Sequence, residues 1–405
     1  MKLLIACNDY PYPADHGGRV DMWGRIQVLR EMGCTVDLIV CTAQTPGDEE
    51  LAEMKRYARR ILACPRRTRP ADLLGGLPLQ VLSRRSLAEA EIGEAYDAVL
   101  LEGDYVYPVL HNPTLRYGEA LLRVHNDERA YFRALAGSTK RPLHKLYYWS
   151  ESYKFGRLAR RLLQETDGWL FISSKEEAAF RARYPERRSV FLPPPVARGR
   201  FAPAPLTAAR VVFIGSLFMP NNREAIDWYL RRVHPQLIAD PEYRFVIAGN
   251  SRGQGLGWLQ AYDLSRVELH DSPPSLDAIY RSGYLFVNPM RHGAGVKLKT
   301  IEAIQHGLPV VSTSIGCEGT GLADGKQIRI ADTADGFAAA VRELLGDRRA
   351  ALGLLAAAQA YIREHYDHRR VLERALGMQP GAAAAHGPQS ERQVQPGQAA
   401  QAVPR

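Results

Sequence analysis

Short apolar runs alternate with helical patterns along most of the chain. Leu3 to Cys7 is a continuous apolar run, Val20 to Met32 carries apolar residues at helical spacing, and Val36 to Val40 is a second apolar run. This order predicts a strand, a helix ended by Gly33 and another strand, which opens a parallel α/β sheet. Further strands are predicted in the first half at Ala98 to Leu101, Ala120 to Val124 and Trp169 to Ile172.

Three consecutive prolines, Pro193 to Pro195, interrupt this pattern because proline disfavours both helix and central strand. We interpret Phe191 to Val196 as a hinge. A second series of strands is predicted after it, at Val211 to Ile214, Phe245 to Ala248, Val267 to Leu269, Leu285 to Val287 and Pro309 to Ser312.

The two series predict two Rossmann-like domains, residues 1–195 and 196–358, that face each other across a cleft. Ligands of such domains bind beyond the carboxyl ends of the strands. A helical stretch, Ala351 to Leu376, follows the last strand, and we expect residues 359–378 to pack back on the first domain. Residues 379–405 have almost no large apolar side chains, which predicts a disordered tail.

Composition is ordinary for a globular protein, with 46% hydrophobic and 24% charged residues among 405. Lysine and arginine number 53 against 44 aspartates and glutamates, so the net charge of +9 favours an anionic partner. Lys55 to Arg85 mixes basic and apolar residues and is a candidate for peripheral contact with an anionic membrane, although a solvated helix face remains the alternative. A nucleic-acid partner is not expected, because no aromatic-interleaved basic motif is present.

The five cysteines form no Cys-x-x-Cys motif and are odd in number, which fits neither a disulfide framework nor a zinc site. A reducing cytoplasm is therefore the expected compartment. Every apolar run is shorter than the roughly 18 residues that a membrane span needs. We expect a cytoplasmic protein that contacts the inner face of a membrane only peripherally.

The most informative stretch runs from Val287 to Thr313, where a predicted strand leads into a glycine loop and then a short helix. Gly293 and Gly295 let the backbone approach a ligand closely, and free amides at the start of a helix attract anions. The loop and helix also carry three cations, Arg291, Lys297 and Lys299. This combination predicts a cradle for a diphosphate.

This stretch resembles the donor-site signature of retaining GT-B glycosyltransferases, in particular glycosyltransferase family 4. The resemblance covers roughly residues 1–376 and extends to Gly17-Gly18 and to Val211–Ser216. It implies a UDP- or GDP-linked sugar as donor, a glycan or lipid-linked acceptor, retention at the anomeric carbon, and neither a metal nor another cofactor. Gly18 would approach the sugar phosphate from the first domain.

Matched to the signature, Glu302 would bind the donor ribose, and a carboxylate is well suited to accept hydrogen bonds from two hydroxyls. The position of the other signature glutamate is Ala294. A second departure follows Gly215, where the family's arginine and lysine are replaced by Ser216 and Asn222. Lys297 and Lys299 would therefore neutralise the diphosphate, with help from Arg291 or Arg223 and from the helix predicted to begin near Asn222.

His125 follows a predicted strand at the cleft edge and resembles the family's histidine beside the transferring sugar, so it is the catalytic candidate. Asp127 and Glu128 follow it and are candidates for the acceptor side. Glu102 and Asp104 imitate the Asp-x-Asp metal motif of the other glycosyltransferase fold, but a place on the acceptor side is expected for them as well.

The resemblance thus implies a glycosyltransferase that acts in cell-surface polysaccharide or lipopolysaccharide-type biosynthesis. Two alternatives stay open. One is a sugar-nucleotide epimerase on the same fold, which would need no acceptor. The other is an inactive module that binds a sugar nucleotide without transferring the sugar.

Overall fold

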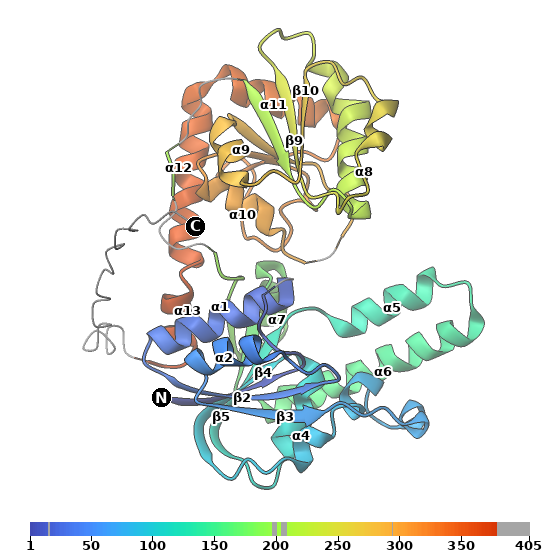
Figure 1. Ribbon diagram of the computed structural model, residues 1–405, viewed down its shortest axis with the longest axis vertical. Coiled ribbons are helices and arrows are strands. Elements are labelled where there is room, and N and C mark those ends of the chain that lie inside the picture. The colour runs from blue at the N-terminus through green and yellow to red at the C-terminus, as the bar shows by residue number, and fades with distance from the viewer. Residues whose placement is uncertain (15–16, 197–200, 204–208, 294, 379–405) are drawn as a thin grey trace, which may run out of the picture.

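The chain is seen in a computed structural model that describes residues 1–14, 17–196, 201–203, 209–293 and 295–378. It forms two lobes, each built around a parallel sheet, which lie one above the other in Figure 1. Ala294 and the predicted tail, 379–405, lie outside the described residues. The two-lobed α/β architecture agrees with the fold predicted from the sequence.

The N-terminal lobe contains a seven-stranded sheet in the order β3-β2-β1-β4-β5-β6-β7. Its strands are β1 (Lys2–Cys7), β2 (Thr35–Thr42), β3 (Arg60–Pro65), β4 (Ala95–Glu102), β5 (Arg116–Val124), β6 (Gly168–Phe171) and β7 (Arg188–Phe191). Its helices are α1 (Gly17–Glu31), α2 (Asp48–Tyr57), α3 (Leu79–Leu82), α4 (Ser86–Glu89), α5 (Glu128–Ser138), α6 (Pro142–Glu165) and α7 (Ser174–Arg183).

The C-terminal lobe contains a six-stranded sheet in the order β10-β9-β8-β11-β12-β13. Its strands are β8 (Arg210–Ile214), β9 (Arg244–Gly249), β10 (Val267–Asp271), β11 (Leu285–Asn288), β12 (Val310–Ser312) and β13 (Arg329–Ile330). Its helices are α8 (Pro220–Trp228), α9 (Leu276–Ser282), α10 (Leu298–Gln305), α11 (Ala334–Gly346) and α12 (Arg348–His365).

Strand order reverses once in each sheet, and ligands of such folds bind at these points. β1 pairs with β2 on one side and with β4 on the other, while β8 lies between β9 and β11. Loops that leave the carboxyl ends of such neighbouring strands diverge and leave room for a ligand. The residues that follow β1, β4 and β5 therefore share one edge of the first sheet, and those that follow β8 and β11 share one edge of the second.

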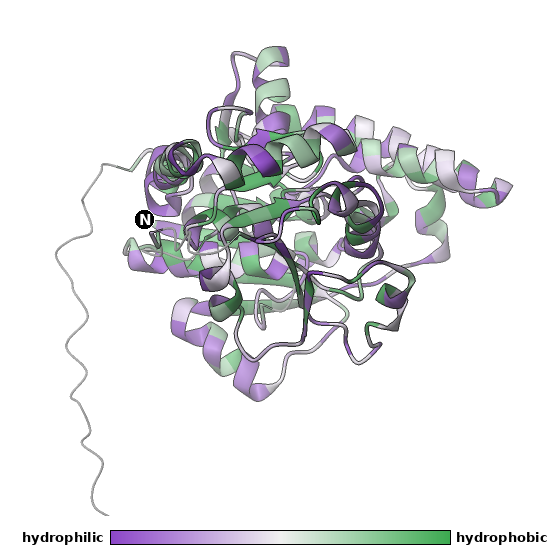
Figure 2. Cartoon of the chain, turned by 90° about the horizontal axis from the view of Figure 1, so that it is seen from above, coloured by the Kyte–Doolittle hydropathy of each residue, from purple (hydrophilic) through white to green (hydrophobic). Residues whose placement is uncertain are grey.

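Each sheet is covered on both faces, so each lobe has two apolar layers. Figure 2 shows the strands as largely hydrophobic, whereas many helices carry hydrophilic residues. Fully buried residues of the central strands, such as Leu4 and Ile5 in β1, lie on opposite faces and belong to different layers. Burial on both faces explains why these strands are continuous apolar runs in the sequence.

Three strands were absent from the sequence prediction, and all three lie at sheet edges. β3 begins with Arg60 and ends with Pro65, β7 begins with Arg188, and β13 has only two residues. Edge strands are less buried and can carry charged residues and proline, so they lack the apolar run that reveals a central strand. The N-terminal helix also begins earlier than predicted, because Gly17 and Gly18 form its first turn and not a loop.

The chain crosses between the lobes twice. Leu192 to Val196 makes the first crossing, and its residues Leu192, Pro193 and Pro194 are buried. The helical stretch predicted to start at Ala351 is in fact broken at Tyr366, where Asp367 caps a further helix, α13 (His368–Ala375). Within this stretch, α13 is the part that packs on α1 of the N-terminal lobe. We therefore propose a lobe boundary at this break in place of residue 358.

The basic and apolar segment Lys55 to Arg85 is for the most part integrated into the N-terminal lobe. It supplies β3 and the buried Val81, and it leaves Leu73 and Leu74 exposed on the surface. Among the described residues, none of the helices combines the length and apolar character that a membrane span requires.

Candidate functional site

A cavity of about 440 Å³ lies at the strand ends of the N-terminal lobe. It is lined by residues that follow β1, β4 and β5, together with Gly18 from the first turn of α1. His125, directly after β5, is among them. The structure thus places Gly18 and His125 on the same cavity, with Gly18 in the first turn of a helix.

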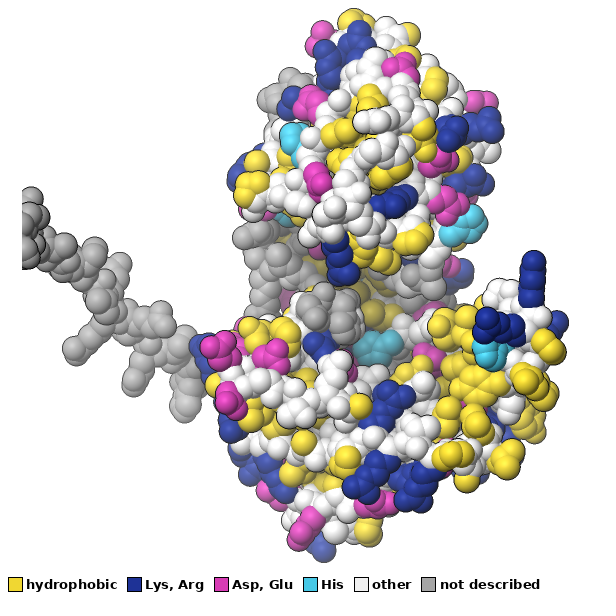
Figure 3. Space-filling view, turned by 45° about the vertical axis from the view of Figure 1, so that its right-hand side comes forward, with side chains coloured by type: hydrophobic (Ala, Val, Ile, Leu, Met, Phe, Trp, Pro, Cys, Tyr) yellow, Lys and Arg dark blue, Asp and Glu magenta, His cyan; other side chains and the backbone are white. Residues whose placement is uncertain are grey.

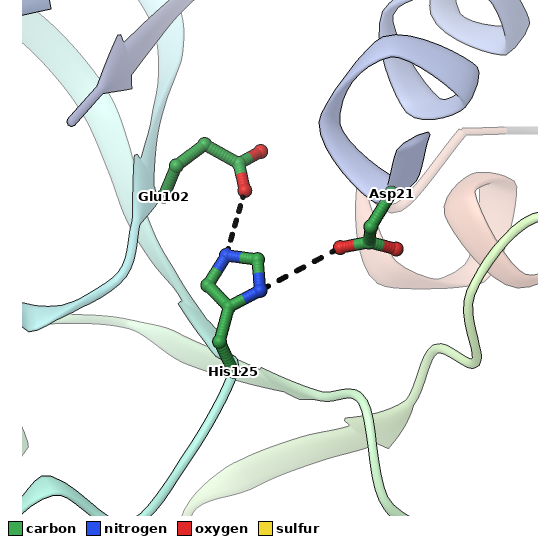
Figure 4. Close-up of side chains that lie close together, drawn as sticks. All are labelled: Asp21, Glu102 and His125. Atoms are coloured by element: carbon green, nitrogen blue, oxygen red, sulfur yellow. Dashed lines mark hydrogen bonds and ion pairs between the residues drawn. The ribbon is translucent and has the colours of Figure 1, made fainter. Parts of the chain in front are cut away.

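His125 is held beside two buried carboxylates, as Figure 4 shows. Its Nε2 atom is 3.1 Å from Oε2 of Glu102, and its Nδ1 atom is 3.8 Å from Oδ2 of Asp21. The first distance is a hydrogen bond, whereas the second leaves Nδ1 able to reach another partner. Asp21 comes from α1 and Glu102 from the end of β4, so two separate elements hold the ring of His125, which itself follows β5.

Two buried arginines complete this network. Arg25 donates to Glu102 at 2.6 Å and to Asp21 at 3.1 Å, and Arg123 donates to Asp21 at 2.8 Å. Arg123 also donates to the carbonyl oxygen of Leu192, at the start of the first crossing between the lobes. Two cations thus face two carboxylates in an interior where unpaired charges would be costly.

The arginines keep both carboxyl groups ionised. Burial alone would raise the pKa of Asp21, but Arg123 and Arg25 outweigh it and hold that pKa below its usual value. Burial also opposes ionisation of Glu102, and Arg25 and His125 together lower its pKa. The ring of His125 therefore lies beside two carboxylates that stay ionised.

Asp21, Glu102 and His125 are also the group of potential metal ligands that lie close together among the described residues, with ligand atoms within 4.8 Å of one another. Both carboxylates already accept hydrogen bonds from guanidinium groups. A cation placed here would have to displace or repel Arg25 and Arg123. The surroundings of Asp21, Glu102 and His125 therefore suit a network that positions the histidine better than they suit a divalent metal ion.

The four residues predicted on the acceptor side take different positions. Glu102 is 1% exposed, so it acts on His125 and cannot present its carboxylate on an exposed acceptor surface. Asp127 is the N-cap of α5 and accepts a hydrogen bond from the backbone amide of Ala130 at 2.9 Å. Asp104 and Glu128 both line the cavity, which leaves them as the acceptor-side candidates.

Asp104 and Glu128 are acids of raised pKa. Burial and the nearby charges of Glu128 and Asp127 raise the pKa of Asp104 to about 7. Burial likewise raises the pKa of Glu128, which accepts a hydrogen bond from the Tyr105 hydroxyl at 2.7 Å. Near neutral pH, Asp104 is therefore present in both protonated and ionised forms, so it can either donate a hydrogen bond to an acceptor hydroxyl or accept one from it.

In the C-terminal lobe, Lys297 stabilises the glycine loop from within. Its ammonium group donates to the carbonyl oxygens of Gly293 and Gly295, and the residue is 8% exposed. Both glycines have positive φ, 119° and 79°, which other residues adopt only with strain. Lys297 therefore shapes the loop as well as adding charge to it.

Lys299 lies on α10 beside the end of β8. Its Nζ donates to Oδ1 of Asn222 at 2.5 Å, while Nδ2 of Asn222 donates to the carbonyl oxygen of Ser216 at 3.0 Å. A methyl group at Gly215 would lie 2.9 Å from this Nζ, so the glycine makes room for the lysine. Burial and the charge of Lys297 lower the pKa of Lys299 to about 7.

Glu302 and Arg291 are both exposed, in contrast to the two lysines. Glu302 follows Lys299 on α10, and its carbonyl oxygen faces Nδ1 of His306 at 2.8 Å. His306 stacks on Tyr280, with 4.1 Å between ring centroids. The guanidinium of Arg291 lies 5.7 Å from the ring centroid of Trp228, toward α8. The predicted donor residues therefore gather around the ends of β8 and β11, with Arg291 at one side.

The two halves of the site belong to facing surfaces. In Figure 1, α10 lies at the end of the upper lobe that faces the lower lobe, and Figure 3 shows the surface hollowed between the lobes. The lobes touch where the amide of Ser174 donates to the carbonyl oxygen of Gly319 at 3.1 Å and where Lys175 pairs with Glu318 at 2.6 Å. The two lobes are therefore in direct contact in this structure.

Sequence reasoning missed Asp21, Arg25 and Arg123. One signal was available, because Arg123 interrupts the apolar run Leu121–Val124 and is fully buried. A charged residue in a central strand requires a buried partner of opposite charge. Asp21 and Arg25, which are spaced i, i+4 on the core-facing side of α1, supply part of that network.

Comparison with known proteins identifies the family of the chain. Residues 208–347, which contain the glycine loop, match the family described as Glycosyl transferases group 1. A protein of Klebsiella pneumoniae, described as an uncharacterized 44.6 kDa protein in the cps region, is 36% identical over 389 residues, 91% of this chain and 97% of that protein.

Solved structures of low sequence identity share the fold. A mutant of S. aureus TarM, in complex with fondaparinux, α-GlcNAc-glycerol and UDP, gives a TM-score of 0.63 at 11% identity and covers 93% of this chain and 99% of its own. Anabaena Alr3699/HepE, in complex with UDP and glucose, gives a TM-score of 0.56 at 12% identity over 92% of this chain and 98% of its own. The fold is GT-B, and the chain belongs to the group 1 glycosyl transferases.

Proposed function

We propose that the protein transfers a sugar from a UDP- or GDP-linked donor to a glycan or lipid-linked acceptor, with retention at the anomeric carbon. The observation that carries this proposal is the pair of sites on the two lobes: a lysine-rich glycine loop on one and the His125 network on the other. The relative in a cps region supports a role in cell-surface polysaccharide biosynthesis. The UDP complexes of the structural neighbours support a nucleotide sugar as donor.

In this proposal the glycine loop holds the donor diphosphate. Lys299 contacts the phosphate oxygens, Lys297 maintains the loop, and Glu302 accepts hydrogen bonds from the ribose hydroxyls. Negative charge develops on the departing nucleotide during transfer, and fixed cations stabilise it without reorganisation. Ser216 and Asn222, which occupy the positions of the family's arginine and lysine, orient Lys299 in place of binding phosphate directly.

The N-terminal lobe positions the sugar and the acceptor. His125 offers Nδ1 to a sugar hydroxyl while Glu102 fixes its ring, and Asp104 and Glu128 bind the acceptor hydroxyl. The departing phosphate takes the acceptor proton, so the reaction requires no protein nucleophile. We also propose that no metal takes part, because two lysines neutralise the diphosphate. Contact between the lobes excludes water, whose attack would hydrolyse the donor.

A thermal-shift panel tests the donor assignment. UDP, GDP, ADP, CMP and their sugars are compared, and a ligand at a hundredfold its dissociation constant stabilises the protein by about 2.7 kcal/mol. We expect UDP or GDP and the corresponding sugars to shift the melting temperature. Incubation with the selected donor then separates the alternatives: an epimerase changes the sugar without an acceptor, and an inactive binding module leaves the donor intact even when acceptor glycans are supplied.

Replacing His125 with alanine should lower kcat by about a hundredfold, because the ring positions the sugar at the reacting centre. Donor affinity, measured by thermal shift, should stay close to wild type, since the nucleotide binds the other lobe. Asp347→Ala is the control, because Asp347 caps α12 in the other lobe by accepting from the amide of Ala350 at 2.9 Å, and its loss should cost about 1 kcal/mol of stability with little loss of rate. A wild-type kcat in the His125 variant would remove the histidine from the mechanism.

Donor affinity should fall as pH rises through about 7. In the free protein the pKa of Lys299 is about 7, and a bound diphosphate would raise it because opposite charge favours the protonated form. Binding therefore takes up a proton above pH 7, and the dissociation constant should rise by up to about tenfold per pH unit. Calorimetric titrations at several pH values measure this, and Lys299→Arg should remove the dependence. A flat profile in the wild type would contradict the phosphate contact.

A further inference from the structure

Helices α5 and α6 form a hairpin that projects from the N-terminal lobe, and we call residues 128–165 the arm (Figure 1). The arm is held at its inner side by Phe132 and Phe155, whose rings stack at 5.3 Å. Its outer side exposes large apolar side chains, and in Figure 3 hydrophobic and basic side chains gather on the projecting part of the lower lobe. These exposed residues are Tyr131, Leu143, Leu146, Trp149 and Tyr153.

Four of these side chains form a stripe along α6. Leu143 is 79% exposed, Leu146 70%, Trp149 47% and Tyr153 66%. Spacings of three, three and four residues place them on one face of a helix. The buried residues of α6, which include Phe155, Leu158 and Leu162, follow the opposite face. A contiguous apolar stripe that no described part of the protein covers indicates an interaction surface.

The charge around the stripe favours an anionic partner. Residues 129–161 contain nine lysines and arginines but a single acidic residue, Glu151, which is buried and pairs with Lys154 at 3.1 Å. Lys140, Arg141 and Lys145 are exposed at the tip of the arm, next to Leu143 and Leu146. An amphipathic helix with leucine and tryptophan on one face and basic residues beside them is suited to the interface of an anionic bilayer.

The base of the arm is continuous with the proposed acceptor site. A second cavity, of about 620 Å³, is lined by α5 and α6 residues, including Tyr153 of the stripe and Phe155. It shares Asp104, Asn126 and Glu128 with the cavity at His125. An acceptor attached to a lipid in the same membrane would therefore have a short path from the arm to the reacting centre.

We infer that the arm docks the protein on an anionic lipid bilayer, with Leu143, Leu146 and Trp149 in the interface and Lys140, Arg141 and Lys145 on lipid phosphates. Docking on the membrane is inferred from the arm alone. Its consequence, the delivery of a lipid-linked acceptor, rests on the proposed function. In this inference the arm, and not the segment Lys55 to Arg85, is the principal contact with the membrane. Among the described residues of that segment, no apolar stripe of comparable length and charge is exposed.

Flotation of the full chain with vesicles tests this docking without donor or acceptor. We expect binding to an equimolar mixture of phosphatidylcholine and phosphatidylglycerol, little binding to phosphatidylcholine alone, and release by salt. Leu143→Ser with Leu146→Ser should lower the partition coefficient at least about tenfold, and Lys140→Glu with Arg141→Glu and Lys145→Glu at least about a hundredfold. Leu269→Ser with Leu352→Ser, two exposed leucines of the other lobe, should leave it unchanged.

A second measurement needs no destabilising variant. Brominated phosphatidylglycerol should quench tryptophan fluorescence of the bound wild type, and Trp149→Phe should remove most of that quenching. Equal binding by wild type and arm variants, or no quenching, would overturn the inference. So would a solution dimer that the Leu143 and Leu146 changes dissociate, since it would assign the stripe to a second copy. A variant in which Lys297 and Lys299 are replaced should still float, so loss of catalysis and loss of docking are distinguishable.

Discussion

Replacing both Lys297 and Lys299 with alanine is expected to lower kcat/KM by at least about a thousandfold. Removing one group that stabilises transition-state charge typically costs about a hundred- to a thousandfold, and here the second change also releases the glycine loop. Lys297 donates to the carbonyl oxygens of Gly293 and Gly295, and Lys299 is oriented by Asn222. The measurement is steady-state transfer from the donor that the thermal-shift panel selects.

The single variants distinguish the two roles. Lys299→Gln should remove phosphate binding while the loop stays in place, whereas Lys297→Gln should weaken the loop and raise KM for the donor. Lys326→Ala, an exposed lysine elsewhere in the same lobe, is the matched control and should keep full activity. A double variant that remains folded by circular dichroism and transfers within about threefold of the wild-type rate would contradict the phosphate assignment.

Replacing Arg25 with methionine is expected to reduce the free energy of unfolding by about 3–5 kcal/mol. Arg25 is fully buried and pairs with both Asp21 and Glu102, so its loss leaves two buried carboxylates with only Arg123 and His125 as partners. Stability is measured by urea denaturation. The same variant should lose activity at temperatures where it is still folded, because Glu102 no longer holds His125 in one orientation.

The matched control for this effect is Arg56→Met. Arg56 forms an ion pair with Glu53 at 2.8 Å, but its side chain is 70% exposed, and exposed pairs contribute about 0–1 kcal/mol. If Arg25→Met were no more destabilising than this surface change, the network would not organise the N-terminal lobe. Its stability would then come from the apolar layers alone.

The sequence revealed the interior of both sheets because burial on two faces imposes an apolar run. Leu3 to Cys7 and Val211 to Ile214 are such runs, and both are central strands. Edge strands are less buried and need no continuous apolar run, so the sequence does not reveal them. β3, which begins with Arg60 and ends with Pro65, is an example. The break between α12 and α13 was also not predicted, because the apolar spacing continues across Asp367. The start of α13 is instead set by Asp367, whose side chain caps the helix.

The proposed donor residues could be found in the sequence because they lie in one local motif. Gly293, Gly295, Lys297 and Lys299 form one short segment, and the structure keeps them together. The His125 network is instead assembled from α1, β4 and β5, which lie far apart in sequence. Only the three-dimensional contacts reveal that Glu102 faces inward to His125, and that Asp127 caps a helix.

A crystal structure of the protein with its nucleotide sugar tests the central claim most directly. We predict diphosphate oxygens within hydrogen-bond distance of Nζ of Lys299, ribose hydroxyls on Glu302, and the sugar directed toward His125. A donor bound away from the glycine bend, or one whose phosphates meet only water while Lys299 stays on Asn222, would contradict the account.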